Sequence, residues 1–420
     1  MLFSYRKAGP KNAWARLFAI AALIGVAALA GCARPAPPPP PAPVAEAPPP
    51  AVIEEEPPAP NPLNKDEPGF LRLPNMAEGT TPVRVGIILP LSSTNAGTRA
   101  LAQSMLRAAQ LAMFDAGNPN ILLIVEDEGN GGTPAAAAAR RLLAQGSEVI
   151  VGPLFAASVS AVAPVARDRG VPVLAFSTEK SVAGRGIYLI SYLPGNEVKR
   201  VVEFAAGRGL RKFGALVPRT PYGELVGEAM RDAVAAAKGE TVTVTPFTPT
   251  AAGAVAPARE ASNSGAEALM IAQGGAVLRA MAPAIGNRDT IKLLGTGLWD
   301  DDTLNRDIGL EGSWYAAPAP NADAAFITKY RNAFGAAPAQ LASLAYDAVA
   351  LVALLAPGEP YNRFTRPNLM DPNGFAGVSG VFRFRPDGTS ERGLAVLEVN
   401  RNGPRIVSPA PTTFQPARGS

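Results

Sequence analysis

The sequence offers few side chains that could carry out catalysis. It contains no His and a single Cys, Cys32. These counts exclude a Ser-His-Asp triad, a Cys-His dyad, His-ligated metal sites, Cys-rich zinc sites and an intrachain disulfide. The neighbouring acids Asp127 and Glu128 could suggest paired catalytic carboxylates or a cation site, but nothing else supports either, and we expect both on the surface. We therefore expect no enzyme, no cofactor and no metal.

Polar residues at the ends of predicted strands suggest binding instead. In the stretch VRVGIILPLS (Val83–Ser92) an apolar run from Val85 to Leu89 stops at Pro90. A short apolar run bounded by a breaker predicts a strand buried on both faces. Because ligands of open parallel sheets lie beyond the carboxyl ends of the strands, Leu91 and Ser92 are the first candidates for a site.

Strand-like and helical segments alternate along the rest of the chain, which predicts an α/β protein with parallel sheets flanked by helices. Strands are predicted at 85–89, 121–126, 148–151, 171–176, 213–217, 241–246, 266–272, 291–295 and 314–317. Helical patterns lie between them, and two further helices are predicted at 322–334 and 341–355. Pro386-Asp387-Gly388 separates the strand-like runs 381–385 and 395–399, which predicts a hairpin.

The N-terminus has the features of an exported lipoprotein. A basic segment with Lys7, Lys11 and Arg16 precedes a short apolar core, and small residues lead directly to Cys32. The core is too short for a membrane span and is typical of a signal peptide. Leu29-Ala30-Gly31-Cys32 resembles a bacterial lipobox, which implies cleavage before Cys32 and acylation of its thiol. The alternative is a plain signal peptide with an incidental thiol. Ala33, in place of Asp, resembles an outer-membrane address.

Residues 34–82 are rich in Pro and Ala and should stay extended without a core. At about 3.1 Å per residue in polyproline II, such a segment could reach on the order of 100 Å. It is either a semi-rigid tether or a spacer of no particular length. The formal charge of the whole chain is +4, and Arg6, Lys7, Lys11 and Arg16 precede the expected cleavage point. The mature chain is therefore about neutral, which argues against nucleic-acid binding.

The region from Val83 to about Arg405 resembles the type I periplasmic solute-binding domains of the leucine/isoleucine/valine-binding kind. Its details look closest to penicillin-binding-protein activator lipoproteins. The resemblance rests on VGIILPLS, VGPLFAASVSAVAPVARDRGVPVLAFSTEKSVA, TPYG, LLGTGLWDDD, LASLAYDAVAL and GFAGVSGVFRFRPDGTSERGLAVLEV. It implies two lobes with a ligand cleft between them. One departure is that no helical-repeat domain, which some activators carry, precedes this region.

The resemblance places strand-end loops of both lobes along the cleft. The implied ligand-binding residues are Leu91, Ser92, Phe155, Ala156, Ser158, Ser177 and Thr178 in the first lobe, and Tyr222, Gln273 and Asp300 in the second. The chemistry suits a small carboxylate, because Ala156 to Ser158 begin a helix whose unpaired N–H groups favour an anion. Tyr222 could cover the ligand, and Asp300 could accept from an α-amino group.

Each of these residues also has a purely structural interpretation. Ser158 could simply cap its helix, and Ser177 and Thr178 could satisfy backbone groups of their loop. Tyr222 could be a turn residue that packs on its own lobe. Asp300 could belong to a solvated turn.

These observations predict a signal peptide over 1–31, the acylated Cys and Pro-rich linker over 32–82, a binding-fold domain over 83–408 and a flexible tail over 409–420. The first lobe is expected at about 83–193 and 318–372, and the second at about 194–317 and 373–408.

We expect a lipid-anchored protein on the periplasmic side of the outer membrane that activates a penicillin-binding protein in peptidoglycan synthesis. The alternative is a substrate-binding lipoprotein for branched-chain amino-acid ABC transport or sensing. The expected partners are the membrane, a penicillin-binding protein, and an amino-acid-like or peptidoglycan-derived ligand.

Overall fold

The computed structural model describes residues 70–73, 81–286, 289–301, 303–304 and 306–414, all within the unit Ala59–Ser420. The predicted signal peptide, Cys32, most of the predicted linker and the last six residues, 415–420, lie outside the described residues.

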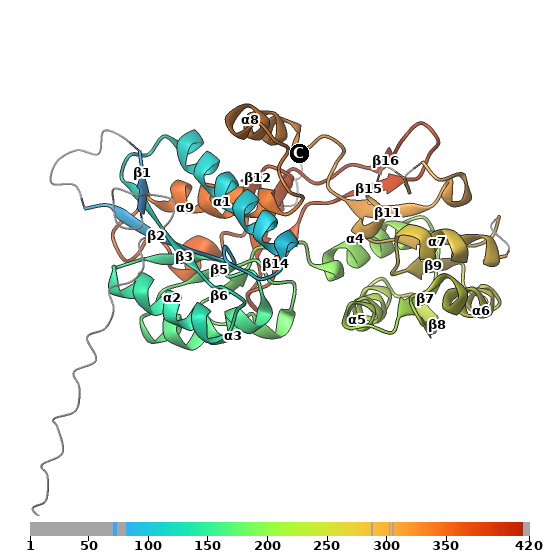
Figure 1. Cartoon of the computed structure of the whole chain (residues 1–420). Helices are drawn as coiled ribbons and strands as arrows, with labels where there is room; N and C mark the ends of the chain where they lie inside the picture. Colours follow the sequence, from blue (N-terminus) through green and yellow to red (C-terminus); the bar gives the residue numbers. More distant parts are fainter. Residues whose placement is uncertain (1–69, 74–80, 287–288, 302, 305, 415–420) are drawn as a thin grey trace, which may run out of the picture. The chain divides into compact units, whose positions relative to one another are not determined.

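The first sheet is built around the apolar run Val83–Leu89, which forms β2 (Figure 1). Its strand order is β1-β3-β2-β4-β5-β6, and β2 to β6 run parallel. The other strands are β1 (Phe70–Arg72), β3 (Ile121–Asp127), β4 (Val149–Val151), β5 (Val173–Ala175) and β6 (Ile187–Leu189). β1 lies within the predicted linker and forms the edge of this sheet, where it pairs antiparallel with β3.

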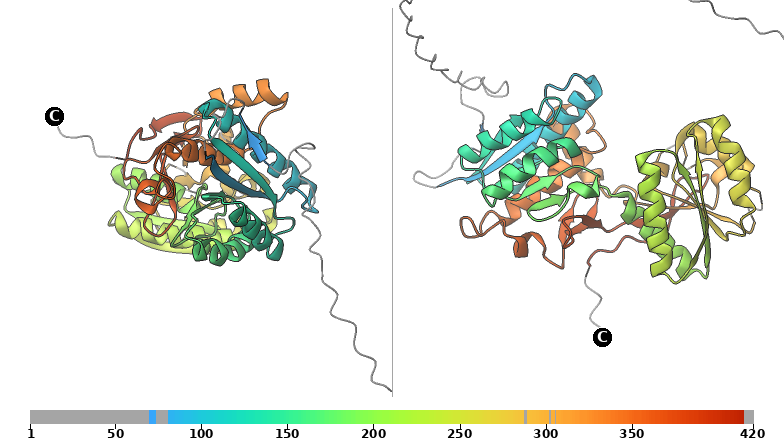
Figure 2. Two further views of the ribbon diagram at one scale, coloured as in Figure 1. Left: turned by 90° about the vertical axis from the view of Figure 1, so that its left-hand side faces the viewer. Right: turned by 90° about the horizontal axis from the view of Figure 1, so that it is seen from below.

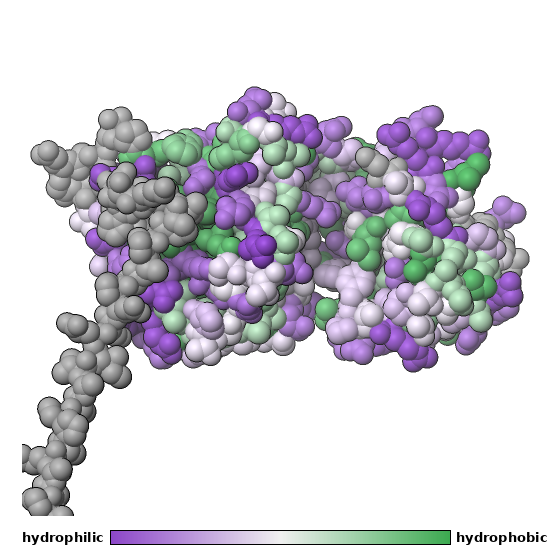
Figure 3. Space-filling model, viewed as in Figure 1, coloured by the Kyte–Doolittle hydropathy of each residue, from purple (hydrophilic) through white to green (hydrophobic). Residues whose placement is uncertain are grey.

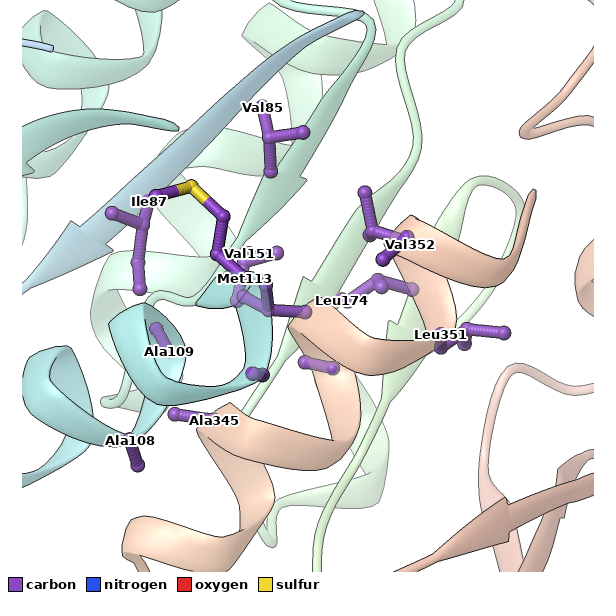
Figure 4. Packing of buried hydrophobic residues seen from close by; sticks show 14 of the residues in the cluster. Val85, Ile87, Ala108, Ala109, Met113, Val151, Leu174, Ala345, Leu351 and Val352 are labelled. Carbon is purple, nitrogen blue, oxygen red and sulfur yellow. The ribbon is translucent and has the colours of Figure 1, made fainter. Parts of the chain in front are cut away.

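Helices cover both faces of this sheet, which explains why its strands are continuously apolar. α1 (Ala96–Ala116), α8 (Ala324–Phe334) and α9 (Ala342–Leu355) pack on one face, and α2 (Thr133–Ala144) and α3 (Ala156–Asp168) pack on the other (Figures 1 and 2). Figure 4 shows how closely α1 and α9 approach, because Ala108, Ala109 and Ala345 are small where the two helices meet. Val85 and Ile87 of β2 point into the same cluster.

The second sheet has the order β16-β15-β11-β10-β9-β7-β8, with β7 to β11 parallel and β15 and β16 antiparallel. Its strands are β7 (Lys212–Pro218), β8 (Glu240–Phe247), β9 (Ala268–Ile271), β10 (Lys292–Gly295), β11 (Trp314–Ala317), β15 (Ala395–Glu398) and β16 (Arg405–Ser408). α4 (Pro194–Gly207) and α5 (Pro221–Ala236) cover one face, and α6 (Ala251–Ser262) and α7 (Gly275–Met281) cover the other. The expected pair of α/β lobes with parallel sheets is confirmed.

The third sheet shows where the expected lobe division differs from the structure. β12 (Phe375–Gly377), β13 (Gly380–Phe384) and β14 (Ser390–Arg392) are antiparallel, and Phe375, Phe382 and Phe384 pack into the core of the first lobe. Residues 373–392 therefore pack with the first lobe rather than the second. The Asp387-Gly388 turn does form a hairpin, but its returning strand is β14. The run at 395–398 instead pairs with β11 in the second sheet. The remaining short helix, α10 (Arg366–Leu369), lies before this sheet.

The chain passes between the lobes at 190–193, 318–323 and 393–394. Part of the predicted flexible tail makes a further link. At the end of β16, Arg200 Nη2 of α4 donates to Ser408 Oγ (2.6 Å) and to Pro409 O (3.1 Å). The Phe414 ring then lies 4.5 Å from the Arg383 guanidinium of β13. We refer to residues 409–414 as the return segment.

Candidate functional site

The predicted first-lobe site lies where the parallel strands of the first sheet end. Because β2, β3, β4 and β5 run in the same direction, the loops that follow them meet at one edge. Asp127 at the end of β3 and Asn130 in the following loop hydrogen-bond to the loop that follows β2. Asp127 Oδ1 accepts from Ser92 N (3.2 Å) and Gly129 N (2.8 Å), and Asn130 Oδ1 accepts from Thr94 N (2.9 Å).

Glu128 is the central group of this edge, and the expectation that it lies on the surface is wrong. Its side chain is fully buried, and Oε1 accepts from Leu154 N (3.0 Å) just before α3. Oε2 and Ser158 Oγ are both buried without a hydrogen bond of standard geometry. Burial raises the pKa of Glu128 from its ordinary 4.5 to about 7, the Ser158 hydroxyl and the Leu154 N–H lower it, and Asp127 raises it.

α3 begins at the same edge, and like α2 and α4 it has no side-chain cap. Its N-cap residue is Phe155, which has no side-chain acceptor, and the structure shows no side-chain cap hydrogen bond there. Helices usually begin with Ser, Thr, Asp or Asn, whose side chain satisfies a first-turn N–H group. The first turn of α3 therefore offers donors and a positive dipole end to an external anion.

The predicted first-lobe residues divide into two groups. Ser92, Phe155 and Thr178 are exposed at this edge, Leu91 and Ala156 are partly buried, and all five lie in or beside its loops. Ser158 and Ser177 are buried. The Ser158 hydroxyl lies near Glu128 instead of reaching solvent, and Ser177 Oγ accepts from Glu179 N (3.1 Å) within its own loop.

The second-lobe residues gather around a carboxyl group that the sequence did not single out. Tyr222, at the start of α5, is hydrogen-bonded through its hydroxyl to Thr296 Oγ1 (2.8 Å). The next residue, Gly297, donates its N–H to Glu197 Oε2 of α4 (2.9 Å). A Cβ on Gly297 would lie 2.7 Å from Glu197 Oε1, so only Gly permits this approach.

Glu197 is partly buried, and its ionisation is suppressed. Burial raises its pKa from the ordinary 4.5 to about 7. The hydrogen bond from the Gly297 N–H lowers the pKa, and the charge of Asp300 raises it further. Burial, and then the charge of Glu197, raise the pKa of Tyr222 well above its usual range. One signal for this role of Glu197 was visible in the sequence: it is an acid in the first turn of a helix that begins with Pro194 and follows a strand.

The other two predicted residues of the second lobe differ in their surroundings. Asp300 is exposed beside this cluster. Gln273 is partly buried; its side chain donates to Gly274 O (3.1 Å), and its carbonyl accepts from Trp299 Nε1 (2.8 Å). Gln273 therefore supports its loop and holds Trp299 in place.

Two hollows adjoin α4 away from these residues. One, of about 240 Å³, includes Lys180, Asp232 and Arg385, and the other, of about 600 Å³, includes Arg200 and Phe414. Neither is lined by a predicted site residue.

Hydrophilic residues are spread over the face in Figure 3, and among the described residues no helix combines the length and apolarity needed to cross a bilayer. The described residues contain no group of three or more His, Cys, Asp or Glu that could hold a metal ion.

Comparison with known proteins gives one family and many related folds. The sequence model described as periplasmic binding protein matches residues 82–404. No curated protein matches. A Rhodospirillum rubrum structure, assigned to branched-chain amino acid ABC transport, shares 19% identity at a TM-score of 0.69, covering 78% of this chain and 100% of its own.

Two other related structures were solved with a ligand. The branched-chain amino acid transporter substrate-binding protein LivJ from Streptococcus pneumoniae, in complex with isoleucine, shares 19% identity (TM-score 0.53; coverage 78% and 100%). A solute-binding protein from R. palustris, in complex with benzoate, shares 17% (TM-score 0.54; coverage 80% and 98%). At these identities the likeness establishes the fold, and the expected type I periplasmic binding fold is confirmed.

Proposed function

The chain belongs to the periplasmic binding protein family, and we propose that it binds a small solute that carries a carboxylate group. The observation that carries this proposal is the N-terminus of α3, which has no side-chain cap and lies at the carboxyl edge of a parallel sheet. A carboxylate there would accept from first-turn N–H groups and interact favourably with the helix dipole. Isoleucine and benzoate, the ligands of the two related structures, both carry a carboxylate.

The second lobe supplies groups that suit the other end of a zwitterionic ligand. Glu197, Asp300 and the hydroxyl groups of Tyr222 and Thr296 form an acceptor-rich cluster. An α-ammonium group is satisfied by such acceptors, and its positive charge would stabilise the two carboxylates. We therefore favour an amino acid over a simple carboxylate, and a role in branched-chain amino-acid uptake or sensing.

The role as an activator of a penicillin-binding protein is the less supported of the two. The family match and the related structures concern solute binding, and the described residues add no observation that favours a penicillin-binding protein as partner. A peptidoglycan-derived ligand that carries a free carboxylate is compatible with the α3 site, so wall fragments belong in the test.

Acylation of Cys32 and an outer-membrane position remain predictions from the sequence. An outer-membrane anchor would place the protein far from an inner-membrane permease and would favour sensing over uptake. Cell fractionation of the wild type and of Cys32→Ala would decide this. The anchor predicts that only the wild type sediments with outer membranes.

The experiment for binding is thermal melting of the full chain with isoleucine, leucine, valine, benzoate and peptidoglycan fragments. A ligand at one hundred times its Kd adds about 2.7 kcal/mol of stability, which raises the Tm by several degrees. Failure of every carboxylate to shift the Tm would reject the proposal.

A single substitution tests the site itself. Phe155→Asp places a carboxylate at the N-cap of α3, where it would cap the helix and repel an anionic ligand. We expect loss of at least tenfold in affinity, about 1.4 kcal/mol. Ser160→Asp is the matched control, because it adds the same charge on the exposed face of the same helix.

A further inference from the structure

Each lobe places one protonatable carboxyl group beside the residues that we assign to ligand binding. In the first lobe this group is Glu128, which accepts from Leu154 N two residues before α3 begins. In the second lobe it is Glu197, which accepts from Gly297 N beside Tyr222 and Thr296. In the proposed binding mode Glu197 acts only as an acceptor, and Glu128 has no role.

Glu128 has no positive partner among the groups described around it. Asp127 is the charged group that acts on it, and it is an acid; α3 contributes the Ser158 hydroxyl, and the β4–α3 loop contributes the Leu154 N–H. Arg141, on α2 of the same lobe, pairs with Glu126 (2.7 Å). A ligand carboxylate at the N-terminus of α3 would therefore add a second negative charge next to a buried carboxyl group.

A ligand ammonium group would have the opposite effect on Glu197, because it would bring a positive charge to this carboxyl group. Asp300 from the β10 loop and the Tyr222 phenol from α5 face it, and neither carries a positive charge. An ammonium group bound among these acceptors would supply the missing positive charge and favour ionised Glu197.

We propose that ligand binding in this protein is proton-linked, with Glu128 taking up a proton when an anionic group occupies the N-terminus of α3 and Glu197 releasing one when a cationic group binds in the second lobe. The inference rests on the proposed function and adds a regulation by pH to the same site. The proton comes from solvent in the first lobe and returns to solvent in the second.

The sign of the pH dependence follows for each class of ligand. The free pKa of both groups is about 7. A bound anion raises that of Glu128, so affinity is constant below pH 7 and falls above it by up to about tenfold per pH unit. A bound ammonium group lowers the pKa of Glu197, so affinity falls below pH 7 with a similar limit. Benzoate should therefore bind best at low pH, and isoleucine should bind best near pH 7.

The test is calorimetric titration of the full chain with isoleucine and with benzoate at about pH 6, 7 and 8, at each pH in two phosphate-free and carboxylate-free buffers that differ in ionisation enthalpy. The difference in heat between the two buffers gives the number of protons exchanged. Benzoate should bind with uptake of up to about half a proton at pH 7 and of close to one proton at pH 8. Glu128→Gln should abolish this uptake, and the surface variant Glu228→Gln should retain it. With isoleucine, Glu128→Gln should show net release, and Glu197→Gln net uptake.

Proton exchange and ligand binding are read separately in this experiment. Binding with no proton exchanged at any pH by the wild type would overturn the inference and leave the proposed function standing. Absence of binding by either probe and by the wall fragments would reject both. Because the wild-type proton counts decide the matter alone, the inference stays testable even if a variant fails to fold.

Discussion

Replacement of Glu128 by Gln should make stability less sensitive to alkaline pH. The folded pKa is about 7 and the ordinary value is 4.5, a rise of about 2.5 units. A raised carboxyl pKa means that folding favours the protonated form. Wild-type stability from this group is therefore complete below pH 4.5 and is lost as pH rises toward 7. At about 1.36 kcal/mol per unit, the loss is on the order of 3 kcal/mol.

The amide of Glu128→Gln cannot ionise, and its Oε1 can still accept from Leu154 N. The free energy of unfolding of the variant minus that of the wild type should therefore rise by about 3 kcal/mol between pH 4.5 and pH 8. Urea unfolding of both proteins across this range measures it. Any constant packing difference between Gln and protonated Glu cancels, because only the change with pH is read.

Glu228→Gln provides the control, since Glu228 is exposed on α5 and its replacement should give a difference that stays flat with pH. A flat difference for Glu128→Gln as well would refute the reasoning. It would mean that the Glu128 carboxylate is hydrated or neutralised when ionised, contrary to its complete burial in the structure.

Two further substitutions test the second lobe and the core. Gly297→Ala should displace Glu197, because the new Cβ would lie 2.7 Å from Oε1. We expect the free energy of unfolding to fall by about 1–3 kcal/mol and isoleucine to bind more weakly. Wild-type affinity would count against the assigned cluster. Arg392→Leu should destabilise the protein by about 3–5 kcal/mol, because it leaves the buried Asp347 without the guanidinium 3.2 Å away. The double variant Asp347→Leu/Arg392→Leu should recover part of that loss, and no recovery would contradict the explanation by an unpaired charge.

The elements that could be predicted from sequence are those whose signal is local. The run VRVGIIL is apolar on both faces and forms β2. The Asp387-Gly388 turn was predicted for the same reason. Its returning strand was not, because the choice between 390–392 and 395–398 depends on pairing with β11, some eighty residues earlier in the chain.

The site residues that were missed depend on distant parts of the chain. Asp127-Glu128 looks like a solvated turn until the β4–α3 loop, 26 residues away, covers Glu128. Glu197 looks like an ordinary first-turn acid until Gly297, 100 residues away, donates to it. In both cases burial by a remote loop, and not the local pattern, changes the chemistry of the carboxyl group.

The return segment has a mechanical consequence. It joins the edge strand of the second sheet to β13 of the first lobe alongside the covalent passage at 393–394, so it works as a brace across the hinge. Any movement that separates these two anchor points must detach Phe414 from Arg383. A cation–π contact between partly buried groups contributes on the order of 1 kcal/mol, equivalent to roughly fivefold in a binding constant. The brace is thus a weak noncovalent link that adds to the covalent passage at 393–394.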